Sequence, residues 1–185
     1  MSKHGSVTRL TVVSTARTRL TTWTTARTRL TTWTPDDFAD LHELHADPAV
    51  MTFLRRGTPE PPEETHRRLD TYLREQESPG WTKWRVEDLS GQMIGRAGFS
   101  PLRKDRELGY TLAQHTWGEG LATEIARALV QWHRDHPFDG SGVAYAESGN
   151  LASRRVLEKA GFNFVGERDQ GGHPQAFYEL PAIGA

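Results

Sequence analysis

The stretch of residues 107–162 constrains the fold of this chain more than any other part of the sequence. It begins with a strand-like run, residues 107–112, and then passes through a glycine-rich turn into a segment of helical periodicity. A strand, a glycine-rich turn and a helix start form a cradle for an anion, because backbone N–H groups and the positive end of the helix dipole converge there. Gly118 and Gly120 carry no side chain that would block the approach to those amides. The sequence therefore predicts a phosphate-binding loop at this point.

The segments around the loop predict an α+β domain. Residues 123–134 are the expected central helix, with one apolar face for the core. Residues 143–146 form a short strand, expected to lie parallel to 107–112 through a right-handed crossover. Earlier in the chain, residues 81–89 and 92–100 are joined by a tight turn into a hairpin. The remaining elements are expected from caps and turns: a helix from Pro35 to Asp47, a helix over residues 63–77, a helix that begins at Asn150 and ends at Gly161, and a closing hairpin over residues 162–180.

An exact tandem repeat occupies the N-terminal region. Residues 15–24 recur residue for residue as 25–34, and a degenerate third copy begins at Thr8. Ten residues is too short a period for a solenoid unit, so a local duplication of one strand segment, natural or introduced, is the simpler interpretation. We expect residues 27–33 to be the first strand of a domain spanning 25–185, preceded by an extension over 1–24. The surplus copy could form an added edge strand, a frayed arm or an exchanged strand in a homodimer.

Composition excludes several classes of function. The chain has 185 residues, no cysteine and a formal net charge of −1. A thiolate nucleophile, a disulfide framework and a thiolate metal site are therefore excluded, and a broad electrostatic grip on nucleic acid or on an anionic membrane is not expected. The histidines form no metal-binding pattern, and no apolar run approaches the roughly 20 residues that span a bilayer. We expect a cytoplasmic protein without a bound metal.

Two familiar phosphate motifs are also absent. The turn contains neither the lysine of a GxxxxGK[ST] loop nor the third glycine of a GxGxxG fingerprint. The sequence therefore disfavours nucleotide hydrolysis and hydride transfer.

Two motifs in this order resemble a known family. Trp117-Gly118-Glu119-Gly120-Leu121-Ala122-Thr123-Glu124, followed by Asn150-x-x-Ser153 and by a helix ending in Gly161-Phe162, is similar to the GNAT acyltransferase superfamily. The similarity covers roughly residues 27–180 and is greatest to the RimJ/RimL-type branch of ribosomal-protein N-acetyltransferases. It implies a three-layer fold with a mixed, mostly antiparallel sheet, one central parallel pair of strands and helices on both faces.

The resemblance also implies acetyl-CoA as the acyl donor. Its pyrophosphate would lie on the amides at the glycine-rich turn, and Asn150 would bind the pantetheine arm while also capping its helix. The residues expected to contact the donor are Leu112, Trp117, Gly118, Glu119, Gly120, Leu121, Ala122, Thr123, Asn150 and Ser153.

The catalytic groups are less clearly marked than the donor site. Many GNAT enzymes carry a tyrosine in the last helix that protonates the CoA thiolate, but Leu157 stands there, and Ser153 is the substitute that the resemblance offers. A serine hydroxyl can donate a hydrogen bond to sulfur, and its alternative role is a solvated helix serine. Glu107 is the first candidate for the general base, Glu147 the second and His115 the third. Each of these three could instead be a surface side chain.

The leading hypothesis is an acetyl-CoA-dependent N-acetyltransferase that uses direct attack by a primary amine in a ternary complex. The acceptor could be a protein N-terminal α-amine or a small amine, and a longer acyl donor is also open. A non-catalytic CoA-binding module for sensing or assembly is the alternative from another class. Arg55 and Arg56 either face solvent in a loop or contact an anionic substrate or cofactor.

Overall fold

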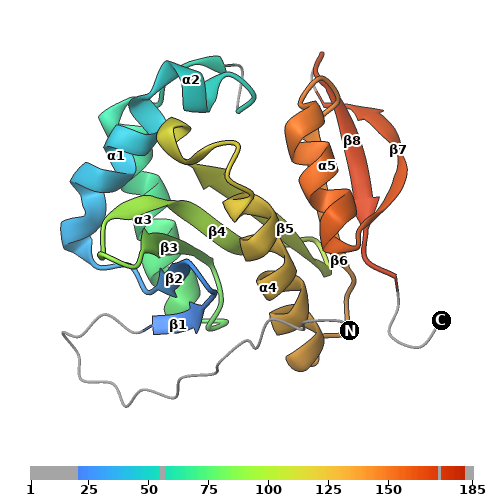
Figure 1. The fold of residues 1–185 in the computed structure, drawn as a ribbon, viewed down its shortest axis with the longest axis horizontal. Coiled ribbons are helices and arrows are strands. Elements are labelled where there is room, and N and C mark those ends of the chain that lie inside the picture. Colours follow the sequence, from blue (N-terminus) through green and yellow to red (C-terminus); the bar gives the residue numbers. More distant parts are fainter. Residues whose placement is uncertain (1–20, 55–56, 171, 182–185) are drawn as a thin grey trace.

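A computed structural model of the protein describes residues 21–54, 57–170 and 172–181. In this part of the chain, eight strands form one sheet in the order β1-β2-β3-β4-β5-β6-β8-β7 (Figure 1). β5 and β6 are parallel, and the other neighbouring pairs are antiparallel, which confirms the expected α+β sheet with one central parallel pair. The strands are β1 (Thr21–Thr24), β2 (Thr28–Thr31), β3 (Lys83–Asp88), β4 (Met93–Leu102), β5 (Asp105–Leu112), β6 (Gly142–Glu147), β7 (Asn163–Asp169) and β8 (Pro174–Glu179).

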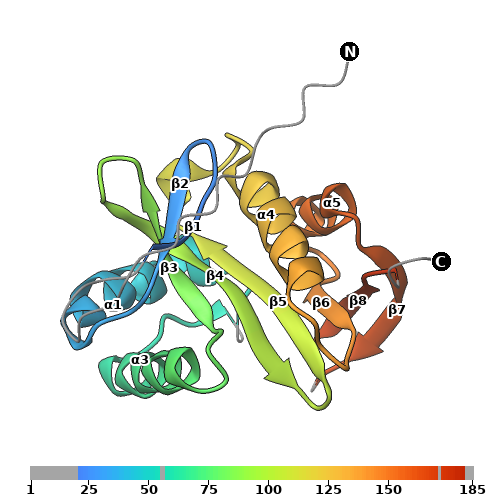
Figure 2. The same ribbon diagram turned by 90° about the horizontal axis from the view of Figure 1, so that it is seen from below.

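Helices cover both faces of the sheet, as expected (Figure 2). α1 (Phe38–Ala46), the short α2 (Pro48–Met51) and α3 (Pro62–Glu77) lie on one side, whereas α4 (Leu121–Asp135) and α5 (Leu151–Ala160) lie on the other. None of the helices in the described part of the chain combines the length and the apolar character that crossing a bilayer would require.

The first helix starts later than its sequence signals predict. Residues Pro35–Asp37 form a 3-10 turn, and α1 begins only at Phe38. The Asp37 carboxylate accepts hydrogen bonds from the Thr34 amide (2.7 Å) and the Thr34 hydroxyl (3.0 Å), so the cap itself forms as expected. The helix ends before Asp47-Pro48, because a residue before proline avoids helical geometry.

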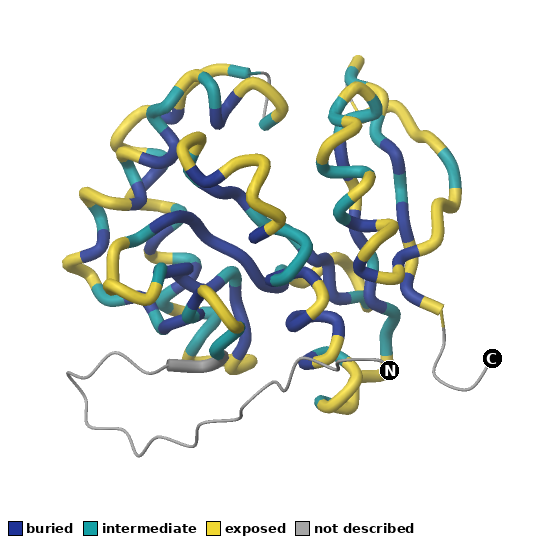
Figure 3. The backbone as a smooth tube through the Cα atoms, viewed as in Figure 1, coloured by how far each residue is buried: buried dark blue, intermediate teal, exposed yellow. Residues whose placement is uncertain are grey.

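The main core lies between the sheet and α4. Alternation along the strands directs Leu108 of β5 and Phe99 of β4 to this side, where the Phe99 ring stacks on Trp132 of α4 at 5.4 Å between centroids. A second buried cluster, formed by Trp33, Leu41, Leu69 and Tyr72, lies beneath α1 and α3. Figure 3 shows buried central strands and exposed outer helix faces. The protein therefore has a helix layer packed against each side of its sheet.

The N-terminal repeat forms a hairpin. β1 comes from the end of the first copy and pairs antiparallel with β2, which comes from the second copy. The described part of the surplus copy is thus an added edge strand, and residues 15–20 lie outside the described residues. The first strand was expected over residues 27–33, but β2 covers only Thr28–Thr31, and Arg27 belongs to the turn between β1 and β2. The expected domain boundary after residue 24 falls at this turn.

The parallel pair separates partway along its length. β5 and β6 are in register only at Arg106–Gly142, Glu107–Val143 and Leu108–Ala144, although β5 continues to Leu112 and β6 to Glu147. The sheet therefore opens beyond Leu108, at the end of β5 that leads into the glycine-rich loop (Figure 1).

Two glycines let β4 pass close to its neighbours. A Cβ at Gly95 would lie 2.3 Å from the Thr111 carbonyl oxygen, and one at Gly98 would lie 2.0 Å from that of Thr82. The β3–β4 register also shifts between Val86 and Glu87. β4 therefore needs glycine at both positions to pack against its two neighbours.

Candidate active site

The loop that follows β5 presents a row of backbone donors. Gly118 and Gly120 both adopt left-handed conformations, with φ of +82° and +80°. α4 begins at Leu121, two residues earlier than predicted, because Gly120 serves as its N-cap and the Glu124 amide already donates to the Gly120 carbonyl. Within the described residues, the amides of 118–123 donate to no backbone carbonyl. Together with the dipole of a 15-residue helix, they fit a diphosphate.

Two contacts hold this loop closed against the end of β5. The indole Nε1 of Trp117 donates to the Leu112 carbonyl (2.9 Å), and the Thr116 hydroxyl donates to the Ala113 carbonyl (2.8 Å). The ring of Trp117 is nonetheless half exposed, whereas Leu112 is buried. Trp117 can therefore offer an apolar surface to a ligand while fixing the loop.

Asn150 and Ser153 come together at the start of α5. The Asn150 side-chain oxygen accepts from the Ser153 amide (3.0 Å), which confirms the helix-capping role of Asn150. The hydroxyl of Ser153 lies 2.8 Å from the hydroxyl of Tyr110, which also lies 3.1 Å from the Ser153 carbonyl. Tyr110 belongs to β5, beyond the last residue that pairs with β6. This contact therefore joins the part of β5 that does not pair with β6 to the first turn of α5.

The phenol of Tyr110 is held in its protonated form. Burial raises the pKa of Tyr110 to about 12, although the hydrogen bond to Ser153 acts in the opposite direction. A protonated phenol can donate to the Ser153 hydroxyl, which leaves the serine proton for another acceptor.

Glu107 occupies the opposite face of the same strand. Strand alternation places Glu107 and Tyr110, three residues apart, on different sides of the sheet. Glu107 is buried and its carboxylate lies 3.3 Å from Nζ of Lys83, on β3. The lysine reaches it across Gly109, where a Cβ would lie 2.8 Å from Nζ. Glu107 therefore lies in the paired part of β5 just before the opening, on the face opposite to the Tyr110–Ser153 contact.

The other candidate bases are placed less centrally. Glu147 ends β6 on the same face as Glu107, partly exposed, with its carboxylate 3.6 Å from Nδ1 of His173. His115 is exposed on the 3-10 turn Gln114–Thr116. Arg55 and Arg56 lie outside the described residues.

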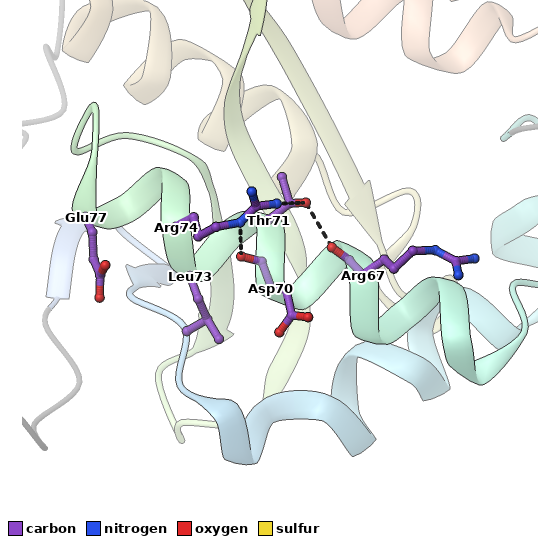
Figure 4. Close-up of a pocket in the computed structure, with 6 residues that line it drawn as sticks. All are labelled: Arg67, Asp70, Thr71, Leu73, Arg74 and Glu77. Atoms are coloured by element: carbon purple, nitrogen blue, oxygen red, sulfur yellow. Dashed lines mark hydrogen bonds between the residues drawn. The ribbon is translucent and has the colours of Figure 1, made fainter.

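Two hollows lie on the side of the sheet that carries α3. One has a volume of about 300 Å³ and is lined by Glu64, Arg67, Arg68, Thr71, Tyr72, Glu75, Lys83 and Ser100. The larger, of about 550 Å³, is lined entirely by residues of α3 (Figure 4). In the same figure, Arg74 turns back onto its own helix, where its guanidinium donates to the Asp70 carbonyl and the Thr71 hydroxyl. The smaller hollow is therefore linked to one candidate catalytic group, Glu107, through its ion-pair partner Lys83.

Metal ligands do not gather anywhere in the described ranges: no group of three or more His, Cys, Asp or Glu side chains could hold an ion there. The donor set at the loop consists of neutral amides, which suit a phosphate rather than a cation.

Sequence reasoning missed three residues that the structure brings to the site: Lys83, Tyr110 and Arg27. Tyr110 could have been found, because it alternates with the core residues Leu108 and Leu112 and a buried phenol needs a partner. The position of Lys83 at the site depends on the order of the strands. The position of Arg27 depends on the unexpected turn between β1 and β2, where the Arg27 guanidinium contacts Glu124 of α4. Neither contact has a signal in the local sequence.

Comparison with known proteins identifies the family. Residues 27–163 match the model of the acetyltransferase (GNAT) domain. The uncharacterized protein YkkB of Bacillus subtilis is 31% identical over 141 residues, which is 74% of this chain and 81% of that protein. A putative GnaT-family acetyltransferase from Bordetella pertussis has the same fold, with a TM-score of 0.74, 22% identity and coverage of 89% and 100% of the two chains. The Salmonella typhimurium acetyltransferase that modifies the N-terminal serine of ribosomal protein L7/L12 also has this fold, with a TM-score of 0.70 and 18% identity. The match covers 83% of this chain and 94% of that one. A CoA thioester is the donor that the loop amides fit, and the chain belongs to the GNAT family of acetyltransferases.

Proposed function

We propose that this acetyltransferase acts on the α-amino group of a protein or peptide N-terminus, as in the RimJ/RimL-type branch, with acetyl-CoA as donor. The observation that carries the proposal is the opening between β5 and β6, flanked by the Ser153–Tyr110 pair on one face and by the buried Glu107 on the other. A thioester between these groups would meet a hydrogen-bond donor for its sulfur and a carboxylate for the attacking amine.

The donor side of this proposal rests on the loop. The amides of residues 118–123 would hold the diphosphate, in a cradle bounded by the side chains of Leu112 and Trp117. The side-chain oxygen Oδ1 of Asn150 is used in capping α5. Its side-chain NH₂ group is therefore the part available to donate to a pantetheine carbonyl. When bound, acetyl-CoA supplies the activated acetyl group, and the side chains of the chain position it and move protons.

Glu107 is the proposed general base. Attack on a thioester requires a neutral amine, and an α-amino group, with a reference pKa of about 7.7–8.0, loses its proton far more readily than lysine at about 10.4. The Glu107 carboxylate could take that proton directly or through a water. Lys83 fixes its position and offsets part of its burial cost. Glu147, on the same face, is the second candidate.

Ser153 is the proposed hydrogen-bond donor to the departing thiolate. Its hydroxyl lies 2.8 Å from that of Tyr110; when the phenol donates to it, the serine can direct its own proton toward the sulfur, so that the phenol would act through the serine. In this proposal the Ser153–Tyr110 hydroxyl pair takes the role of the single tyrosine that the resemblance leads one to expect at position 157, where Leu157 of α5 is buried in the core.

The acceptor class is supported by the fold shared with the Salmonella enzyme and by the hollow lined in part by Lys83, the ion-pair partner of Glu107. A compact small amine is the competing acceptor.

An amine panel tests the proposal. Free thiol released from acetyl-CoA is followed with peptides carrying a free α-amine, with the same peptides Nα-blocked but containing lysine, and with small polyamines. We expect turnover with free α-amines only. Turnover restricted to polyamines would contradict the acceptor assignment, and CoA binding without turnover of any amine would indicate a non-catalytic module.

A further inference from the structure

Arg27 joins the N-terminal hairpin to the phosphate loop. Its Nε donates to Glu124 Oε2 (2.8 Å), its backbone amide donates to Glu124 Oε1 (3.0 Å), and one terminal nitrogen lies 2.7 Å from Oε2. The other terminal nitrogen donates to the carbonyl of Glu119 within the loop (3.0 Å). In Figure 2 the turn between β1 and β2 lies beside the first turn of α4. One side chain thus contacts both parts of the anion cradle.

The turn holds Arg27 in place. The Thr25 hydroxyl oxygen accepts from the amides of Arg27 (3.3 Å) and Thr28 (2.9 Å), and the Thr25 amide donates to the Thr28 carbonyl (2.9 Å). The side chain of Arg27 remains partly exposed, and its guanidinium lies 3.9 Å from the position that a Cβ of Gly120 would occupy. The cation is therefore fixed next to the N-cap of α4.

The negative charge of Glu124 would oppose the binding of a diphosphate, and the guanidinium of Arg27 can offset that charge. Partial burial would by itself raise the pKa of Glu124, but hydrogen bonds from Thr25 and Arg27 lower it, so the carboxylate is ionised at neutral pH. A carboxylate in the first turn of α4 repels a diphosphate that binds to the amides of the same turn. The loop over residues 117–120 contains no Lys or Arg, and its Glu119 adds another negative charge.

We propose that Arg27 is a positioning residue for CoA, which cancels the charge of Glu124 and braces the loop carbonyl of Glu119 so that the cradle can receive the diphosphate. This inference rests on the proposed binding of CoA at the loop. It gives the N-terminal hairpin a role in donor binding, because Arg27 lies in the turn of that hairpin. This turn stands at the junction of the two repeat copies, and β1 comes from the surplus copy.

Paired substitutions in the full-length chain test the proposal. Arg27→Gln and Arg27→Lys both keep a polar donor, but only the lysine keeps the positive charge. Affinity for acetyl-CoA is measured by calorimetry, and KM and kcat by thiol release. We expect Arg27→Gln to weaken binding and raise the KM for acetyl-CoA by about tenfold, with kcat at saturation within about twofold, because a partly exposed charge is partly screened. Arg27→Lys should stay within about threefold of the wild-type affinity.

The double variant Arg27→Gln/Glu124→Gln separates charge from folding. With the carboxylate of residue 124 removed, a neutral side chain at position 27 should no longer weaken acetyl-CoA binding. The affinity should then return to within about threefold of wild type. Arg134→Gln, an exposed arginine at the other end of α4, is the matched control and should leave binding unchanged.

Two results would overturn the assignment of Arg27: Arg27→Gln binding acetyl-CoA as tightly as Arg134→Gln, or no recovery of affinity in the double variant. Failure of the wild-type protein to bind acetyl-CoA would instead refute the proposed function itself.

Discussion

Two hydroxyl groups, those of Ser153 and Tyr110, provide the chemistry on one side of the β5–β6 opening. Their oxygens lie 2.8 Å apart, and either could donate. Because the pKa of Tyr110 is raised to about 12 by burial, the phenol is a poor source of a full proton at neutral pH but a dependable hydrogen-bond donor. At this scale the structure supports stabilisation of the leaving sulfur rather than complete protonation by tyrosine.

Ser153→Ala should reduce kcat by about tenfold to a hundredfold while the KM for acetyl-CoA changes little, because the lost hydrogen bond is strongest to the developing thiolate. Tyr110→Phe should lower kcat less, since Ser153 keeps its proton. Steady-state kinetics on both variants check this, with Ser90→Ala in the exposed β3–β4 turn as control. A larger effect for Tyr110→Phe than for Ser153→Ala would assign the direct contact to the phenol.

Gly118→Ala should weaken binding of acetyl-CoA by about tenfold without loss of the fold. A Cβ at Gly118 meets nothing within 4 Å, so the cost comes from the left-handed backbone, which L-residues adopt at about 1 kcal/mol or more. Gly161→Ala is the matched control, with φ of +99° and equally open space at the end of α5. It should lower stability similarly in thermal unfolding yet leave CoA affinity intact. Equal binding by both variants would refute a role for the loop backbone.

Among the elements, the N-terminal repeat contains one copy more than the first strand of the domain needs. We propose that residues 25–185 form the acetyltransferase domain and that the copy over 15–24 can be replaced. Removing ten residues keeps the phase of the degenerate third copy, so Thr11-Val12-Val13-Ser14 would then stand directly before Thr25, where β1 now ends.

Deletion of residues 15–24 should therefore leave a folded enzyme, because a segment of high strand propensity would take the place of β1. Circular dichroism and thermal unfolding of the deleted protein measure this, and a shift in midpoint of no more than a few degrees is expected. Loss of cooperative unfolding would show that the surplus copy is required.

Sequence signals located the elements well where they are local. Pro35, Asp47-Pro48, Asn150 and Gly161 mark helix ends through caps and backbone preferences, and each lies within three residues of an observed boundary. The start of α4 was missed by two residues because Gly120, in a left-handed conformation, takes the N-cap position that polar side chains usually hold.

Contacts between distant strands could not be predicted in the same way. The Lys83–Glu107 pair depends on β3 and β5 both flanking β4, and on Gly109 leaving space for the lysine. Likewise, an identical repeat cannot reveal that its two copies pair with each other, since either one suits the same position in the sheet. These features are set by tertiary packing.

At the scale of the whole molecule, a buried network ties the helices on one face to the sheet. His45 of α1 accepts from Nε of Arg96 of β4 at Nε2 (3.0 Å), and its Nδ1 lies 3.3 Å from the Glu60 carboxylate. Arg68 of α3 donates to the same carboxylate (3.0 Å from Nε to Oε1). Because an arginine can only donate, Nε2 must be unprotonated, so His45 is neutral and donates from Nδ1 to Glu60.

Protonation of His45 should destabilise the fold. Burial, reinforced by Arg96, lowers the pKa of His45 from 6.5 to about 4, so between these values the unfolded chain binds a proton that the folded one does not. Stability therefore falls as the pH drops through this window, by about 2 kcal/mol between pH 7 and pH 5. Denaturant unfolding at the two pH values measures the loss. His45→Gln should remove most of this dependence, whereas His66→Gln, an exposed histidine of α3, should not. An unchanged pH dependence in His45→Gln would contradict the assignment.

We propose that acetyl transfer takes place at the opening between β5 and β6, with Glu107 as the base on the acceptor side. The most direct test of this proposal is the rate of acetylation of a free α-amine peptide, followed by mass spectrometry, for the wild-type protein and for Glu107→Gln, with Glu63→Gln on the exposed surface of α3 as control. The structure predicts a loss in kcat of about a hundredfold or more for Glu107→Gln with an unchanged affinity for acetyl-CoA, and wild-type rates for the control. Acetylation at the wild-type rate by Glu107→Gln would contradict the account.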